Sequence, residues 1–67
     1  MKNNLEKIRK ERGLTQADLV TALKVSRQTI SSIENGRYNP SLELAFEISI
    51  FFNLSIEEIF IFEKSKE

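Results

Sequence analysis

The 67-residue sequence contains no cysteine and no histidine. Disulfide bonds therefore cannot stabilise the fold, and the side chains that most often bind zinc or haem and carry redox chemistry are missing. A glycine-rich phosphate loop and paired carboxylates in a plausible pocket are absent as well. We therefore expect no metal site, no cofactor, no catalytic residues and no enzymatic activity.

The sequence also lacks a long hydrophobic run after its N-terminal residues. Without such a run it has neither a signal peptide nor a membrane anchor, so we expect a cytoplasmic protein that does not associate with membranes. A chain of this length forms one small domain, placed at residues 1–67, without room for a ligand-sensing domain. No small-molecule site is evident, and stability has to come from apolar packing, which oligomerisation can extend.

The whole chain has no excess of positive or negative charge, because ten basic and ten acidic residues give a formal net charge of zero. Taken alone, this balance argues against a protein that binds nucleic acid by overall attraction. The distribution is uneven: residues 1–40 carry eight basic and four acidic side chains, and residues 41–67 carry two and six. Such blocks can be ordinary solvated surfaces, or they can form a positive end that faces DNA and a negative end that faces away.

Sequence signals for the start and the end of a helix recur along the chain. The expected starts are Asn3 or Asn4, Thr15 with Asp18, Ser26, Pro40 with Ser41, and Ser55 with Glu58. The expected ends are Gly13, the turn at Lys24 and Val25, Asn35 with Gly36, and Asn53. These signals predict a compact all-α domain of five helices. The β-prone segment 60–62 is expected to pair as a short strand with residues 1–3.

The expected fourth helix is apolar around most of its circumference, with its glutamates confined to one narrow arc. We expect Leu42, Ala45 and Phe46 to lie in the core. One small monomer cannot easily bury the apolar residues that remain, and large exposed apolar patches mark contact sites. We therefore predict a homodimer whose interface lies within residues 42–62 and is formed by Phe51, Leu54, Ile56, Ile59, Phe60 and Phe62.

The expected third helix has two unlike sides. Ile30 and Ile33 share one side, and the opposite side carries Arg27, Gln28, Ser31 and Ser32. An α-helix fits the major groove, where arginine suits the two acceptors of guanine and glutamine suits the donor and acceptor of adenine. A solvated surface is the alternative, but the flanks favour DNA: Gln16 begins the preceding helix, where a phosphate can dock, and residues 37–39 form a loop that can grip the backbone.

Residues 15–49 read TQADLVTALKVSRQTISSIENGRYNPSLELAFEIS and resemble the helix-turn-helix of the Cro/repressor (Xre) family. The segments T-Q, V-S-R-Q-T-I-S, E-N-G and P-S-L carry the match, which with the first and last helices covers nearly the whole chain. Short repressors of the family, among them the cytolysin-operon repressor type, are similar in length. The resemblance implies a lambda-repressor-like five-helix fold, a helix-turn-helix at residues 16–34, a homodimer, and double-stranded DNA with two-fold pseudo-symmetry as the partner.

The resemblance also implies roles for individual residues. The base-reading residues of the family match Arg27 and Gln28, with supporting contacts from Ser31 and Ser32. The phosphate-binding residues match Gln16, Ser26, Thr29, Arg37, Tyr38 and Asn39. Arg9 and Glu34 match a structural salt bridge between the first and third helices. Two positions depart from the family pattern: Val20 replaces a small alanine, and Lys24 replaces a turn glycine and is expected in a left-handed conformation.

These features predict a sequence-specific DNA-binding transcriptional regulator, a repressor that binds a pseudo-palindromic operator as a homodimer. Two copies of the third helix would enter successive major grooves about 34 Å apart and block access of the polymerase. The alternative is an antitoxin or a protein-binding adaptor that uses the apolar C-terminal half to bind a different protein. A toxin-sized reading frame next to the gene would favour the antitoxin.

Overall fold

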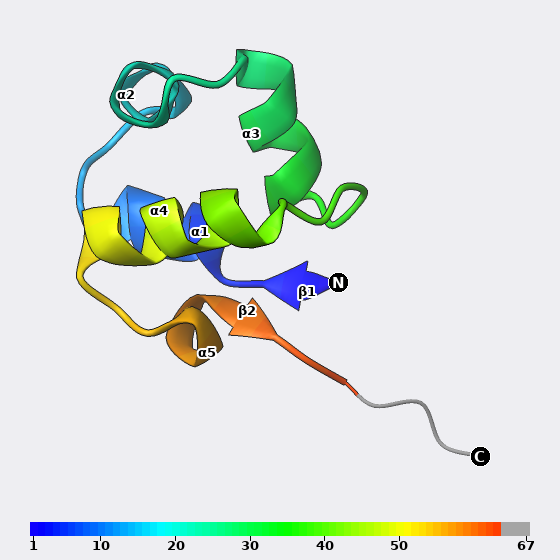
Figure 1. The fold of residues 1–67 in the computed structure, drawn as a ribbon. Helices are drawn as coiled ribbons and strands as arrows, with labels where there is room; N and C mark the ends of the chain where they lie inside the picture. The colour runs from blue at the N-terminus through cyan, green and yellow to red at the C-terminus, as the bar shows by residue number, and fades with distance from the viewer. Residues whose placement is uncertain (64–67) are drawn as a thin grey trace.

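The structure is a computed structural model that describes residues 1–63, so the last four residues of the predicted domain lie outside the described residues. The described residues form five helices and one short antiparallel sheet, which confirms the predicted five-helix, all-α domain. In chain order the elements are β1 (Lys2–Asn3), α1 (Leu5–Glu11), α2 (Gln16–Leu23), α3 (Arg27–Glu34), α4 (Leu42–Phe52), α5 (Ile56–Ile59) and β2 (Phe60–Ile61). In Figure 1, α2 and α3 lie on one side of α4, and α5 with the sheet lies on the other. Within residues 1–63, no helix is both long and apolar enough to span a membrane.

Four of the five described helices begin at a side-chain cap that the sequence predicted. The cap hydroxyl accepts a hydrogen bond from the backbone N–H three residues later, at 3.0 to 3.2 Å, for Thr15, Ser26, Ser41 and Ser55. In two helices the bond is reciprocated, because Asp18 accepts from the N–H of Thr15 at 2.7 Å and Glu58 from that of Ser55 at 2.8 Å. Each cap contributes about 1 kcal/mol, so these helix boundaries follow from local chemistry.

Left-handed backbone conformations end several helices. Gly13 and Gly36 have φ values of 70° and 80°, which glycine adopts without a steric penalty. Lys24 has φ 58° and ψ 45°, as predicted for the turn between α2 and α3. A residue with a Cβ loses roughly 1 kcal/mol there, so this turn holds a small strain that glycine would remove.

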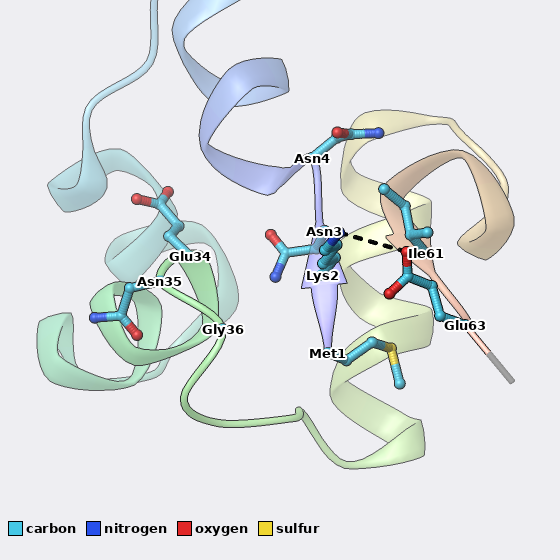
Figure 2. Close-up of a pocket in the computed structure, with 9 residues that line it drawn as sticks. All are labelled: Met1, Lys2, Asn3, Asn4, Glu34, Asn35, Gly36, Ile61 and Glu63. Atoms are coloured by element: carbon cyan, nitrogen blue, oxygen red, sulfur yellow. Dashed lines mark ion pairs between the residues drawn. The ribbon is translucent and has the colours of Figure 1, made fainter. Parts of the chain in front are cut away.

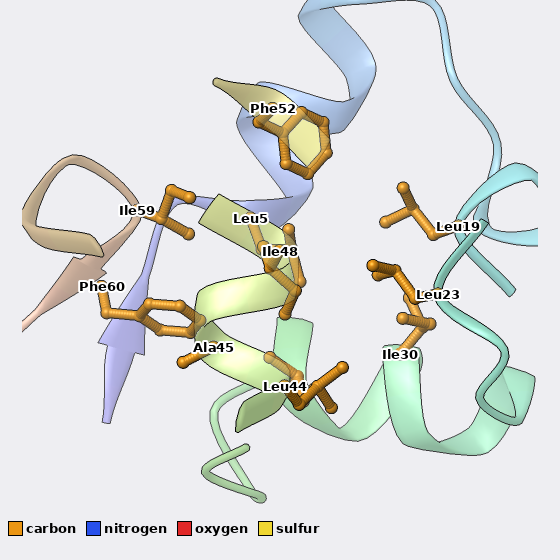
Figure 3. Close-up of a cluster of buried hydrophobic side chains, with 11 residues drawn as sticks. Leu5, Leu19, Leu23, Ile30, Leu44, Ala45, Ile48, Phe52, Ile59 and Phe60 are labelled. Carbon is orange, nitrogen blue, oxygen red and sulfur yellow. The ribbon is translucent and has the colours of Figure 1, made fainter. Parts of the chain in front are cut away.

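The hydrophobic core gathers around α4 (Figure 3). Its buried apolar residues are Leu5, Leu19, Leu23, Ile30, Ile33, Leu44, Ala45, Ile48, Phe52, Ile59 and Phe60. Ala45 lies in the core as expected, but Leu42 and Phe46 point outward, with 71% and 51% of their surface exposed. The prediction that places these two residues in the core is therefore wrong. A helix that is apolar on nearly all sides has no polar face to determine which side turns inward.

The predicted strand pair is present. β1 and β2 run antiparallel, with Lys2 opposite Ile61 and Asn3 opposite Phe60. The backbone N–H of Asn4 also donates to the carbonyl of Ile59 at 2.7 Å. The N-terminal segment therefore holds the end of α5 against the core.

This pairing corrects part of the predicted dimer interface. Ile59 is fully buried and Phe60 is only 8% exposed within the single chain. Both are core residues, because the strand pair draws them inward, and neither protrudes as an exposed contact residue. Of the other residues predicted for the interface, Leu54 and Ile56 are partly buried, and Phe51 and Phe62 are exposed.

Candidate nucleic-acid interface

The helix α3 presents the two contrasting sides that its sequence indicates. Ile30 and Ile33 are fully buried and anchor the helix to the core. Arg27 and Gln28 are exposed in its first turn, and Ser31 and Ser32 are partly exposed. The solvent-facing side therefore offers hydrogen-bond donors and acceptors without the negative charge that would repel a DNA phosphate.

A bidentate ion pair fixes the far end of α3 to α1. The guanidinium of Arg9 donates from Nε to Glu34 Oε2 at 2.6 Å and from Nη2 to Oε1 at 3.2 Å. Its Nη1 donates to the carbonyl of Leu14 at 2.9 Å. The two charged side chains are only 9% and 5% exposed, and the hydrogen bond to Glu34 raises the pKa of Arg9 against the opposing effect of burial. The pair therefore serves as scaffold, the role that the resemblance implies for it.

The side chain of Gln16 connects this buried pair to the exposed end of α3. Its Nε2 donates to Glu34 Oε1 at 3.0 Å, and its Oε1 accepts a long hydrogen bond of 3.5 Å from Arg27 Nε. The expected position of Gln16 at the start of α2 is observed, but its two contacts were not predicted. No spacing rule relates residues that are 18 and 11 positions apart, so only the tertiary structure shows this connection.

Two hydroxyls expected at DNA phosphates pair with each other at the start of α3. Ser26 Oγ accepts from the backbone N–H of Thr29 at 3.0 Å and lies 2.8 Å from Thr29 Oγ1. Each hydroxyl still has further hydrogen-bonding capacity, and both are at the helix end whose partial positive charge attracts anions. The cap and a phosphate contact are therefore compatible at these positions.

The loop after α3 folds back onto the helix. The backbone N–H groups of Arg37 and Tyr38 donate to the carbonyl of Ser32 at 3.0 and 3.1 Å, and Asn35 Oδ1 accepts from Arg37 N at 3.2 Å. The side chains of Arg37, Tyr38 and Asn39 are left exposed. An open hollow of about 270 Å³ is lined by Ser26, Gln28, Thr29, Ser32 and Tyr38. Loop and helix thus form one continuous polar surface.

A larger open hollow, of about 680 Å³, lies beside β1 at the other end of α3 (Figure 2). Its charged side chains are paired within the protein: Lys2 with Glu63 at 3.4 Å, and Glu34 with Arg9. Asn3 donates from Nδ2 to the carbonyl of Ile33 at 2.8 Å and accepts from the N–H of Leu5 at 3.0 Å. The sequence predicts Asn3 as a helix cap and as part of the strand pair, and the structure adds its role in joining β1 to α3.

A third hollow, also of about 270 Å³, has a mainly apolar lining and lies at the N-terminal half of α4. Its residues are Met1, Asn39, Pro40, Leu42, Ala45, Ile56 and Phe60. Met1 and Leu42 are exposed at its edge, and Ile56 is partly buried. The hollow shares Asn39 with the loop that follows α3, so the apolar surface begins where the polar surface ends.

Comparison with known proteins adds independent information. A family model described as helix-turn-helix matches residues 5–59. A protein of Methanocaldococcus jannaschii, named as an uncharacterized HTH-type transcriptional regulator, is 57% identical over 63 residues, which are 94% of this chain and 96% of that protein. The Bacillus subtilis protein named as an uncharacterized HTH-type transcriptional regulator, YgzD, is 39% identical over 64 residues, which are 96% of this chain and 97% of that protein. The ImmF control region 10 kDa protein of Bacillus phage phi105 is 46% identical over 48 residues, 72% of this chain and 53% of the phage protein.

Proposed function

We propose that this chain, which belongs to the Xre-type helix-turn-helix family of DNA-binding transcriptional regulators, represses transcription by occupying a specific pseudo-palindromic operator as a homodimer in the cytoplasm. The observation that carries the proposal is the orientation of α3. Its isoleucines are buried, and Arg27 and Gln28 are left exposed in its first turn. Repression by occlusion needs no chemistry, only a bound dimer that excludes the polymerase.

Base reading is assigned to the exposed side of α3. Arg27 can donate to both acceptors of a guanine, and Gln28 can pair with the donor and the acceptor of an adenine. Ser31 and Ser32 are short enough to allow close approach and to add supporting contacts. The hydrogen bond from Arg27 to Gln16 supports this assignment, because a side chain that is held before DNA arrives loses less conformational freedom on binding.

Phosphate binding is assigned to the flanks of α3. Gln16, Ser26 and Thr29 lie at the N-terminal ends of α2 and α3, where backbone N–H groups and the helix dipole favour an anion. The side chains of Arg37, Tyr38 and Asn39 lie on the exposed loop at the other end of the helix. Contacts of this kind set the position of the protein on the duplex but carry no sequence information themselves.

Dimerisation is assigned to the apolar hollow at the N-terminal half of α4. Leu42 is 71% exposed beside this hollow, and Ile56 forms part of its lining. A contact between two identical patches related by a two-fold axis places each protruding residue against the hollow of the other copy. Phe62, which is 78% exposed beyond β2, offers a further apolar side chain for the contact. None of the hollow's lining residues belongs to α3, although the hollow shares Asn39 with the loop that follows the helix, so both reading helices remain free for DNA.

Selection of bound duplexes from random DNA would give the operator half-site and its spacing. On that operator, Arg27→Ala and Gln28→Ala should each reduce the discrimination against random DNA by roughly 1–3 kcal/mol. Arg37→Ala should weaken binding to the operator and to random DNA alike. It should also reduce, by about 1, the slope with which the logarithm of the binding constant falls against the logarithm of the salt concentration. Lys7→Ala, which removes one positive charge from α1, serves as the control. Equal losses on both DNAs for Arg27→Ala would contradict its reading role, and a selection without enrichment would contradict specific binding.

The alternative function is an antitoxin or an adaptor that binds a different protein. The outward-facing Leu42, Phe46 and Ile50 of α4 favour it, because they form an apolar stripe that a partner could cover. A toxin-sized reading frame beside the gene, whose product forms a stoichiometric complex with this chain, would support the alternative. A chain that self-associates through its apolar surface and represses without a protein partner supports the main proposal.

A further inference from the structure

A fourth hollow lies on a different part of α4, between its C-terminal half and the end of α2. It measures about 430 Å³ and is lined by Ala22, Leu23, Lys24, Glu47, Ile50 and Phe51. Ile50 is 76% exposed, Phe51 is 39% exposed, and Phe46 lies one helical turn before Ile50 with half of its surface exposed. None of the hollow's lining residues belongs to the surface proposed for DNA binding or lines the apolar hollow proposed for dimerisation, although the sequence places Phe51 in the dimer interface. We call this fourth hollow the α2–α4 hollow.

The rim of the α2–α4 hollow carries one charge of each sign. Lys24 and Glu47 are both exposed, and neither forms an ion pair within residues 1–63. In a contact between two identical patches, a residue at one position meets the residue at another position of the second copy, and the converse contact follows by symmetry. A rim with one lysine and one glutamate is therefore complementary to itself, whereas a rim of one sign would repel a second copy.

The backbone at Lys24 provides a separate observation. The residue adopts a left-handed conformation, with φ 58°, in which glycine is free of strain. A lysine at this position is strained, so the geometry of the turn does not explain why the residue is a lysine. Lys24 does, however, line the same hollow as Ile50 and Phe51. Residues held in strained backbone conformations often serve a contact rather than the local fold.

We infer that the α2–α4 hollow is a second self-association surface, occupied by the same hollow of another copy. Lys24 of one copy faces Glu47 of the other, twice across the two-fold axis, and the Ile50 and Phe51 side chains meet between these pairs. The inference rests on the proposed homodimer, because the contact then joins one dimer to the next. A patch of this size gives a small interface, so the association is weak and reversible.

Sedimentation velocity of the full chain over a range of concentrations tests the inference. We expect dimers at micromolar concentration and dimers of dimers at higher concentration. Lys24→Glu and Glu47→Lys each bring like charges together and should weaken the second step by about tenfold or more. The double reversal, Lys24→Glu with Glu47→Lys, should restore it. Glu57→Lys, the same charge change on an exposed residue of α5, should leave it unchanged.

A variant at the other hollow separates this inference from the proposed function. Ile56→Glu should break the dimer contact and leave only the association through the α2–α4 hollow. In the Ile56→Glu background, Lys24→Glu should abolish that association, and Lys24→Glu together with Glu47→Lys should restore it. If Ile56→Glu gives only monomers, or if the double reversal fails to restore association, the inference is overturned while the proposed dimer stands. If the wild-type chain is a monomer at every concentration, both are overturned. Circular dichroism of each variant establishes that it is folded.

Discussion

Arg9 and Glu34 show how a single pair of residues can be essential to the scaffold without being strongly stabilising. Their two hydrogen bonds and the bond to Leu14 satisfy a guanidinium that is almost entirely removed from water. Removal of one partner leaves an uncompensated buried charge, whereas replacement of both by apolar residues removes the cost of burying the charges as well. The pair therefore has to be judged by a comparison of single and double variants.

We predict that Arg9→Met lowers the free energy of unfolding by about 3–5 kcal/mol, because the carboxylate of Glu34 is left buried and unpaired. The double variant, Arg9→Met with Glu34→Met, should recover most of this loss. Urea denaturation followed by circular dichroism provides the measurement. A single variant as stable as the wild type would show that water reaches Glu34 easily and that the pair does not act as a buried scaffold.

Lys24 leads to the opposite expectation for stability. Lys24→Gly should raise the free energy of unfolding by roughly 1 kcal/mol, because glycine adopts the left-handed conformation without the steric penalty. The same substitution should weaken the second step of association, since one rim charge is lost. Val25→Gly, which places a glycine at the next residue, where no left-handed conformation is observed, should be destabilising. A fall in stability for Lys24→Gly would contradict the assigned strain.

For single residues, the sequence predicts the helix caps and backbone conformations that depend on residues close by along the chain. The caps at Thr15, Ser26 and Ser55 and the left-handed Lys24 were all expected, because each involves atoms no more than four residues apart. The contacts of Gln16 with Glu34 and Arg27 were not expected, since they depend on how α2 is placed against α3. The residues proposed to read bases came from the family resemblance together with the polarity of α3.

Among the helices, α2 offers the clearest test of local control. Its capping box joins Thr15 and Asp18 by two hydrogen bonds of 3.1 and 2.7 Å. Thr15→Ala should lower the free energy of unfolding by about 1 kcal/mol, as for other N-cap substitutions. Thr21→Ala, an exposed threonine within the same helix, is the matched control and should be neutral or slightly stabilising because alanine favours helix. Equal urea midpoints for the two variants would contradict the role of the cap.

The helix α4 shows where sequence reasoning at the scale of elements fails. Its existence and its ends follow from Ser41 and Asn53, which cap it at either side. The rotation of α4 about its own axis does not follow from these caps. Apolar residues surround the helix, so its sequence does not determine which side turns towards the core. The structure buries Ala45 and exposes Leu42 and Phe46, and this choice depends on the fit of the whole core. For the same reason, the sequence does not predict that Leu42 borders the hollow proposed for dimerisation.

Over the whole molecule, the proposed reading helix and most of the proposed dimer surface lie in different parts of the chain, although the dimer hollow also includes Met1, Asn39 and Pro40. The part from residue 1 to 40 holds α3 and an excess of basic residues, and the part from residue 41 onward holds α4, α5 and an excess of acidic residues. A dimer formed through the acidic part keeps its negative charges away from the phosphates. The proposed dimer therefore turns a chain without net charge into a particle with a basic face towards DNA.

Thermal unfolding tests this assembly without DNA. Because a dimer stabilises the folded chain by mass action, the melting temperature should rise by roughly 5–10 °C when the protein concentration increases from about 1 to about 100 μM. Ile56→Glu should remove most of this rise, since it places a charge in the apolar hollow beside Leu42. Lys7→Glu, a change on the exposed side of α1, should preserve it. A wild-type melting temperature that is independent of concentration would show that the folded chain gains no stability from a second copy, and the operator would then have to be bound by monomers.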